Sequence, residues 1–316
     1  SGFGTASRGI NSISIIDANT VWAGAYDGTN TSNYITDFTK TINGGTSWTA
    51  GTITTGLSGV GLANISAING DTAWACIFHP TQAVAGGIYK TTNGGGSWTK
   101  QTTAAFVVSS FPDLVYFWDR NNGVAIGDPT SNYFEVYTTS DGGTTWARTA
   151  NTNNQLSSIN AAEYAYTNGY TVIGGTIWFG TTKGRVLKST DKGLTWTVST
   201  VGNGITDVNR VSFADANIGY AGMHNTGNLS YNLAFTTDGG QNWAPVAVGT
   251  NVMGGDFCAV PGTNAIVSVG SDATINGSTW SNDMGYSWTA MEDTTISPQR
   301  LSVKFLDATT GWAGGF

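Results

Sequence analysis

The octapeptide STDKGLTW at residues 189–196 decides the fold, because near-copies of it recur along the whole chain. The five other copies are TINGGTSW (41–48), TTNGGGSW (91–98), TSDGGTTW (139–146), TTDGGQNW (236–243) and SNDMGYSW (281–288). Their closing tryptophans, at positions 48, 98, 146, 196, 243 and 288, are 50, 48, 50, 47 and 45 residues apart. A period of this length indicates a repeat architecture in which each copy belongs to one supersecondary unit.

A second pattern, in which a turn of Asp, Asn or Gly lies between two short apolar runs, alternates with the octapeptide. Its copies are DANTVWAG (17–24), NGDTAWAC (69–76), DRNNGVAIG (119–127), TNGYTVIGG (167–175), DANIGYAG (215–222), GTNAIVSVG (262–270) and DATTGWAGG (307–315). Apolar runs on both sides of such a turn predict a pair of antiparallel strands. A third β-rich run follows, such as GIYKT before the second octapeptide, and the tryptophan of the octapeptide opens a fourth run.

Four short strands in each period of 45 to 50 residues predict an all-β fold, a seven-bladed β-propeller of four-stranded antiparallel blades. Six blades would carry an octapeptide hairpin, and the seventh would be incomplete or closed by the N-terminal stretch SGFGTASRG. We expect one domain over residues 1–316. Its approximate repeats are 10–56, 57–106, 107–155, 156–204, 205–250, 251–295 and the partial 296–316.

Each octapeptide has the chemistry of a tight turn between the third and fourth strands. The Asp or Asn at its third position can accept backbone N–H bonds, and the Gly at its fifth position permits a positive φ. The tryptophan is expected to fill the space between neighbouring sheets. The residues with these structural roles are Asn43 and Trp48, Asn93 and Trp98, Asp141 and Trp146, Asp191 and Trp196, Asp238 and Trp243, and Asp283 and Trp288.

The pattern S/T-x-D-x-G-x-x-W resembles the Asp-box, also called the bacterial neuraminidase repeat. The copies at 139–146, 189–196, 236–243 and 281–288 match it, and those at 41–48 and 91–98 have Asn where the pattern has Asp. With the G-W/Y-A-G pattern added, nearly the whole chain resembles Asp-box propellers related to the photosystem II stability and assembly factor. It is also similar to propeller regions of secreted Bacteroidota surface proteins. The resemblance implies the fold more strongly than any activity.

Composition restricts the classes of partner. A net charge of -7, with 13 scattered Lys and Arg residues, argues against binding to a nucleic-acid backbone. Charged residues make up only 10% of the chain, so Thr, Ser, Asn and Gly must form the polar surface, as suits a secreted or cell-surface protein. Cys76 and Cys258 lie in apolar contexts, which predicts two buried free thiols. The sequence contains no apolar run long enough to span a membrane, and its first residue, Ser1, indicates a processed or trimmed start.

In a propeller, the loops between the second and third strands open on one face around the axis. We expect these loops at 25–37, 78–86, 128–134, 176–184, 223–232 and 271–278. The candidate ligand-binding residues are Asp27, Tyr34, His79, Asp128, Tyr133, Trp178, Phe179, His224, Tyr231 and Asp272. Aromatic rings beside carboxylates suit recognition of a sugar or a peptide. For each residue, the alternative that it only anchors its own turn stays open.

Catalysis is the competing interpretation. Sialidase chemistry needs three convergent arginines, and Arg120, Arg148 and Arg185 lie in or beside turns that point away from the expected face. A glycoside hydrolase that uses two carboxylates stays open as the alternative, with Asp128 and Asp272 as candidate catalytic residues. Two histidines and two separated cysteines have no ligand spacing, so we expect no metal and no cofactor.

The sequence therefore predicts a non-catalytic, secreted or cell-surface module. It would bind a glycan or an extracellular or surface protein through its axial loop face, as part of a longer secreted protein or a surface complex. The acidic chain lacks the basic patch that we would expect of a photosystem II assembly chaperone.

Overall fold

The computed structural model describes residues 2–81, 83–225, 230–246, 252–272, 275–292 and 298–315. The protein is an all-β propeller of four-stranded antiparallel blades, and the described residues form six such blades and one two-stranded sheet. The chain divides into two compact units. Unit 1 comprises Ser1–Glu163 and Asp191–Thr195, and unit 2 comprises Tyr164–Thr190 and Trp196–Phe316. No helix in the described ranges is long and apolar enough to cross a bilayer.

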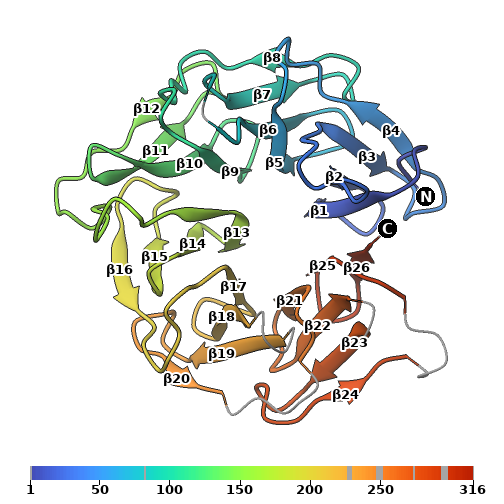
Figure 1. The fold of residues 1–316 in the computed structure, drawn as a ribbon, viewed down its shortest axis with the longest axis vertical. Helices are drawn as coiled ribbons and strands as arrows, with labels where there is room; N and C mark the ends of the chain where they lie inside the picture. The colour runs from blue at the N-terminus through green and yellow to red at the C-terminus, as the bar shows by residue number, and fades with distance from the viewer. Residues whose placement is uncertain are drawn as a thin grey trace. The chain divides into compact units, whose positions relative to one another are not determined.

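Unit 1 contains blades 1 to 3, and the strands of each blade pair in chain order (Figure 1). Blade 1 consists of β1 (Arg8–Ile15), β2 (Val21–Asp27), β3 (Asp37–Thr41) and β4 (Thr49–Thr52). Blade 2 consists of β5 (Gly61–Ala67), β6 (Ala73–Phe78), β7 (Gly87–Thr91) and β8 (Thr99–Lys100). Blade 3 consists of β9 (Pro112–Phe117), β10 (Gly123–Thr130), β11 (Tyr133–Thr139) and β12 (Ala147–Arg148).

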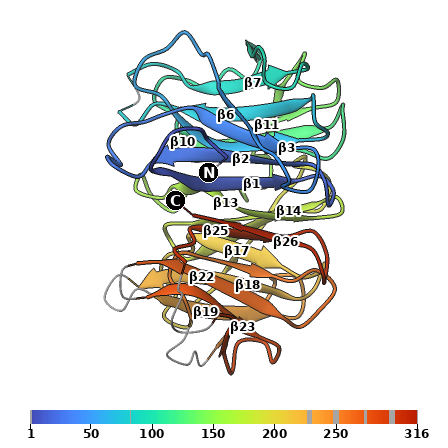
Figure 2. The same cartoon turned by 90° about the vertical axis from the view of Figure 1, so that its right-hand side faces the viewer.

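Unit 2 contains blades 4 to 6 and the two-stranded sheet; Figure 2 shows β17, β18 and β19 of blade 5 from the side. Blade 4 consists of β13 (Ala165–Ile173), β14 (Thr176–Thr181), β15 (Arg185–Ser189) and β16 (Thr197–Thr200). Blade 5 consists of β17 (Arg210–Phe213), β18 (Gly219–Asn225), β19 (Ser230–Thr236) and β20 (Ala244–Pro245). Blade 6 consists of β21 (Asp256–Ala259), β22 (Ile266–Ser271), β23 (Asn276–Ser281) and β24 (Thr289–Ala290). The described residues of the seventh repeat form β25 (Ser302–Phe305) and β26 (Gly311–Gly314).

Each octapeptide forms the turn between the third and fourth strands of its blade, as its chemistry predicts. In blade 3, Asp141 Oδ1 accepts the backbone N–H of Thr145 and the hydroxyl of Thr139, both at 2.9 Å. Gly143, at the fifth position, has a φ of 88°, and the fifth glycine of every other copy also has a positive φ. Because other residues resist this conformation, the glycine is a requirement of the turn.

Tryptophans of the second strands are the main wedges between neighbouring blades. The ring of Trp74 stacks on Phe117 of the next blade with centroids 3.5 Å apart, and its indole N–H donates to the Gly142 carbonyl at 3.2 Å. The indoles of Trp22 and Trp178 donate in the same way, to the carbonyls of Asn69 and Gly239. Of the octapeptide tryptophans, Trp146, Trp196 and Trp288 are buried, whereas Trp48, Trp98 and Trp243 are half-buried. The prediction that the octapeptide tryptophan fills the space between neighbouring sheets therefore holds with a buried side chain in only half of the copies.

Side chains of one blade also form hydrogen bonds with the backbone groups at the free edge of the first strand in the next blade. The Asn64 side chain both donates to the carbonyl and accepts from the N–H of Val115, each at 2.9 Å. In unit 2, the N–H of Ala259 donates to Ser212 Oγ at 2.9 Å. Because an unpaired edge strand invites association with other chains, these bonds both join the blades and protect their edges.

The predicted turn of blade 4 is wrong. The stretch TNGYTVIGG at 167–175 was expected to hold a turn flanked by two strands, but most of it is the strand β13. The hairpin turn is Gly174–Gly175, since Ile173 pairs directly with Thr176 and Gly174 has a φ of 56°. A two-residue glycine turn replaces the Asp or Asn turn of the other blades, and this shifts the second strand onto 176–181.

Candidate functional site

Three aromatic side chains of unit 1 form a continuous row across blades 1, 2 and 3. Tyr34 lies in the loop between β2 and β3, Phe78 is the last residue of β6, and Phe111 comes just before β9. The ring of Tyr34 meets Phe78 edge-on at 5.5 Å, and Phe78 stacks on Phe111 at 4.5 Å. Tyr34 is 39% exposed, and the other two side chains are half-buried. We call these three residues the aromatic row.

A cavity of about 320 Å³ adjoins the aromatic row at Tyr34. It is lined by residues 34–36, 52–57, 59 and 60. His79 stands beside this cavity, because its Nε2 atom would lie 3.5 Å from a Cβ atom on Gly59. The His79 Nδ1 atom accepts the backbone N–H groups of Thr81 and Ala83 at 3.3 and 3.2 Å. In the neutral ring these bonds assign the proton to Nε2, on the side of Gly59.

The loop that leads to Phe111 adds an exposed apolar surface. Its residues Ala104 and Phe106 are buried and anchor it, whereas Val107 and Val108 are 45% and 51% exposed. Because the buried side chains fix the position of the loop, the two adjacent valines form an exposed apolar surface.

Asp27, a predicted ligand-binding residue, anchors its own loop. Its carboxylate accepts the hydroxyl of Thr29 at 2.6 Å and the side-chain amide of Asn33 at 2.7 Å, and lies 3.2 Å from Arg8 Nη1. The hydrogen bond from the Thr29 side chain is the largest cause that holds the pKa of Asp27 below its usual value. The carboxylate is buried, so in this chain it organises the loop beside Tyr34.

Asp128, the first candidate catalytic residue, is hydrogen-bonded to Asp113 on the neighbouring strand, and both are buried. Burial, followed by the charge of Asp128, raises the pKa of Asp113 well above its usual value. The protonated, neutral form of Asp113 is therefore favoured in the folded protein. Because both side chains are buried, neither carboxyl group is presented at the surface to a sugar.

Tyr133 is also engaged within blade 3. The guanidinium carbon of Arg148 lies 4.4 Å from the centroid of the Tyr133 ring, and Arg148 Nη1 lies 3.7 Å from the buried Glu135. The hydroxyl of Tyr137 donates to Glu135 at 3.2 Å. One face of Tyr133 is therefore covered by a cation that belongs to a polar cluster inside the blade.

The prediction that Trp178, Phe179 and Tyr231 lie in rim loops is wrong. Trp178 and Phe179 lie in β14 and are buried, because the glycine turn of blade 4 moves the second strand onto them. Tyr231 lies in β19, where it packs edge-on against Phe257 at 4.9 Å and burial raises its pKa to about 12.

His224 and Asp272 are the remaining candidates, both in unit 2. His224 is half-buried in β18 and its ring lies 5.8 Å from Tyr231. Asp272 is exposed directly after β22. The predicted loops at 223–232 and 271–278 continue into residues 226–229 and 273–274, which lie outside the described residues.

The sequence analysis missed a second cavity of unit 1, of about 480 Å³, beside the turns between first and second strands. Tyr116 and Trp118 line it and meet edge-on at 5.1 Å. Lys192 Nζ lies 5.9 Å from the Trp118 ring and 3.6 Å from Asp119. The run VYFWDR at 115–120 is the signal that could have indicated this cavity.

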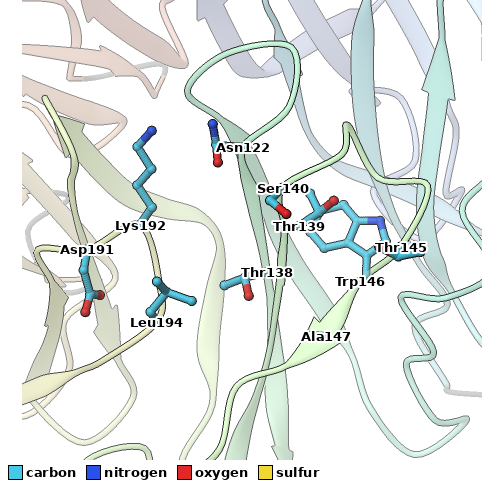
Figure 3. A pocket seen from close by; sticks show the side chains of 10 residues that line it. All are labelled: Asn122, Thr138, Thr139, Ser140, Thr145, Trp146, Ala147, Asp191, Lys192 and Leu194. Carbon is cyan, nitrogen blue, oxygen red and sulfur yellow. The ribbon is translucent and has the colours of Figure 1, made fainter.

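A third cavity of about 290 Å³ lies between two octapeptide turns of unit 1 (Figure 3). Leu194, which is 61% exposed, lies between Asp191 and Thr138 in this view, and Lys192 and Asn122 lie at one end. Most of the residues that line it are polar or charged, and Trp146, Ala147 and Leu194 are apolar.

The described residues contain no group of three or more His, Cys, Asp or Glu side chains that could hold a metal ion. Cys76 and Cys258 are both free and buried, as the sequence predicts. Burial raises the pKa of each thiol, so neither has the character of a nucleophile.

Comparisons with known proteins identify the architecture. No protein-family model matches the chain, and no curated protein matches its sequence. The solved structure of YCF48 bound to D1 peptide superposes with a TM-score of 0.68 at 17% identity, covering 100% of this chain and 92% of that one. YCF48 from Cyanidioschyzon merolae gives 0.69 at 16% identity, with 98% and 93% covered. The WD40 propeller domain of Doa1 gives 0.60 at 11% identity, with 100% and 92% covered. At these identities the likeness shows the fold alone: the chain is a β-propeller similar in structure to YCF48.

Proposed function

We propose that this protein is a non-catalytic binding module that takes a polypeptide partner on unit 1, with the aromatic row at the centre of the contact. The observation that carries this proposal is the row itself, Tyr34, Phe78 and Phe111, beside a cavity and an exposed valine pair. Aromatic anchors next to a pocket are typical of the central residues of protein interfaces.

The geometry of the rings favours a polypeptide over a glycan. One face of Phe78 is covered by Phe111, and the edge-on ring of Tyr34 adjoins it as well. Sugar recognition usually needs an open aromatic face, whereas the surface left here is ring edges, the cavity at Tyr34 and the valine methyl groups. Such a surface suits apolar side chains. YCF48, which is similar in fold, has been solved with a D1 peptide, so peptides are the first class to test.

The non-catalytic part of the proposal rests on the state of the candidate carboxylates. Asp128 is paired with Asp113, and Asp27 is held by its own loop. A glycoside hydrolase remains the alternative function, and of the candidates only Asp272 is an exposed carboxylate. Hydrolysis abolished by Asp272→Asn would establish that alternative.

The proposal includes two further expectations. The six octapeptide turns would be Asp-box repeats, which the hydrogen bonds of the third residue and the positive φ of the fifth support. The protein would be secreted or lie at a cell surface, as its low charge content favours.

The proposal is tested by selecting a displayed random-peptide library on the immobilised protein. Retained peptides should be lost on Tyr34→Ser and on Val108→Asp. Tyr286→Ser is the matched control, since Tyr286 is a 53% exposed tyrosine of a different turn in unit 2. In parallel, the protein is incubated with a panel of polysaccharides and sialosides. Released reducing ends would overturn the non-catalytic assignment, and retention on a polysaccharide without selected peptides would overturn the polypeptide assignment.

A further inference from the structure

The second cavity of unit 1, of about 480 Å³, has walls that come from the turns of three blades. Its volume falls within the range of roughly 300–1,000 Å³ that is typical of small-molecule sites. Among the apolar residues that line it are Ile15 and Ile16 of blade 1, Ala67 and Ile68 of blade 2, and Tyr116 and Trp118 of blade 3. The cavity lies at the turn before β6, whereas the aromatic row meets β6 at its other end, so the two sites are separate.

The apolar wall of this cavity is held by packing and by a backbone hydrogen bond. Ile16 and Ile68 each pack against a hydrophobic cluster of buried residues. The rings of Tyr116 and Trp118 meet edge-on at 5.1 Å, and the Trp118 backbone N–H donates to the Asn122 carbonyl at 3.0 Å. A ligand would therefore meet a surface that is already formed, and little binding free energy would be lost in ordering it.

The carboxylate of Asp119, which also lines the cavity, is engaged within unit 1. Its Oδ1 atom accepts the backbone N–H groups of Asn121 and Asn122, both at 2.8 Å. Its Oδ2 atom accepts the side-chain amide of Asn122 at 2.8 Å and lies 3.6 Å from Lys192 Nζ. Because both oxygens have partners and the ammonium offsets the negative charge, Asp119 does not make the cavity a site for a cation.

Two donor groups of the cavity, by contrast, are without a partner among the described residues. Arg120 is exposed, and its guanidinium forms no hydrogen bond or ion pair within the part of the chain that the structure describes. The carboxamide oxygen of Asn69 accepts the N–H groups of Asp71 and Thr72 at 2.8 and 2.7 Å, which leaves its NH2 group as a donor. Donors and a positive charge beside an apolar wall match a ligand that carries an anion on an apolar body.

We propose that this cavity binds a small carboxylic acid with an aromatic body, such as an indole or phenyl ring. The ring would lie against Ile16, Ile68 and Trp118. The carboxylate, ionised at neutral pH, would accept hydrogen bonds from the Arg120 guanidinium and the Asn69 amide. A sugar fits this cavity less well, because its hydroxyl groups would lie without partners against the aliphatic wall. The assignment does not depend on the polypeptide partner proposed for the aromatic row.

The test titrates indole-3-propionate into the isotope-labelled full chain and follows the indole N–H signal of Trp118. We expect this signal and the amide signals of residues 116–120 to shift and to saturate with a dissociation constant of about 1 mM or below, the affinity usual for a ligand of this size. The primary amide of the same acid keeps the ring and loses the charge. It should therefore bind about fivefold more weakly than the acid.

Arg120→Gln should weaken binding of the acid by about fivefold and leave the affinity for the amide nearly unchanged, because only the acid uses the positive charge. The exposed side chain of Arg120 makes this variant compatible with folding. Lys183→Gln, which removes a cation from unit 2, is the matched control and should bind the acid as the wild type does. The proposal is overturned if saturating acid leaves the Trp118 signal unmoved. It is overturned equally if the acid and its amide bind alike or if Arg120→Gln retains the full affinity for the acid.

Discussion

Lys40 lies over the ring of Trp22, with its ammonium nitrogen 4.8 Å from the ring centroid and 2.6 Å from the carbonyl of Gly70 in the next blade. Lys90 repeats both contacts, with the ring of Trp74 and the carbonyl of Gly142. One tryptophan–lysine pair therefore joins the second and third strands of a blade and ties them to a turn of the following blade. Blade 4 has the same contact between Lys188 and the ring of Trp178.

Removing a second-strand tryptophan should be among the most destabilising single changes. Trp178 is 0% exposed, stacks on Phe213 at 4.1 Å and donates to the Gly239 carbonyl. We expect Trp178→Ala to cost about 3–5 kcal/mol of unfolding free energy, measured by urea denaturation. Trp48→Ala, at a half-buried octapeptide position, is the control and should cost less. Equal losses would contradict the assignment of the main wedge to the second strand.

The fourth position of the octapeptide predicts a stabilising substitution. Lys192 has a φ of 61° where four other copies have glycine, and its ion pair with Asp119 is about 40% exposed on each side. Because the left-handed backbone disfavours a side chain and an exposed pair contributes little, Lys192→Gly should stabilise by about 0.5–1 kcal/mol. The reverse change, Gly142→Ala, would place a Cβ 2.6 Å from the Arg120 carbonyl and should cost about 2 kcal/mol. Thermal and urea unfolding of both variants check the two signs.

The Asp113–Asp128 pair predicts a loss of stability as the pH rises above the usual pKa range of a carboxyl group. The pKa of Asp113 is raised in the folded protein by burial and then by Asp128. Its contribution is therefore fully present below the unfolded value of about 3.9 and is lost as pH rises through the raised folded value. Asp113→Asn keeps a neutral side chain of the same shape, so its melting temperature should fall less than that of the wild type as pH increases. A melting temperature that falls equally with pH in the two proteins would contradict the raised pKa of Asp113.

The octapeptide carboxylates predict the opposite dependence in acid. The backbone N–H of Asn242 and then its side chain lower the pKa of Asp238 to about 2. This contribution is present above the unfolded value of about 3.9 and is lost as pH falls through about 2. Asp238→Asn converts the turn to the form of blade 2, where Asn93 Oδ1 accepts the N–H of Ser97 at 3.0 Å. The variant should lose less stability between pH 4 and pH 2 in a series of acid melts.

Residues with local partners could be predicted from sequence, and residues with distant partners could not. The bonds of Asp141 to Thr145 and the φ of Gly143 depend on neighbours within the octapeptide, so spacing alone indicates them. Trp178 was misplaced because the Gly174–Gly175 turn has no Asp or Asn to mark the end of the first strand.

The candidate site depends on contacts between blades. Tyr34 could be predicted as an exposed loop residue, but its neighbours Phe78 and Phe111 come from the next two blades. The proximity of Asp128 to Asp113 depends instead on how β9 pairs with β10 within blade 3.

The aromatic row is the central claim, and the affinity of one selected peptide tests it most directly. The dissociation constant of that peptide is measured by calorimetry for the wild type, Tyr34→Ser and Tyr286→Ser. We expect Tyr34→Ser to weaken binding by about tenfold or more, as for an interface anchor, with an unchanged melting temperature. Tyr286→Ser should bind as the wild type does. Equal affinity of all three proteins would contradict the placement of the partner on the aromatic row.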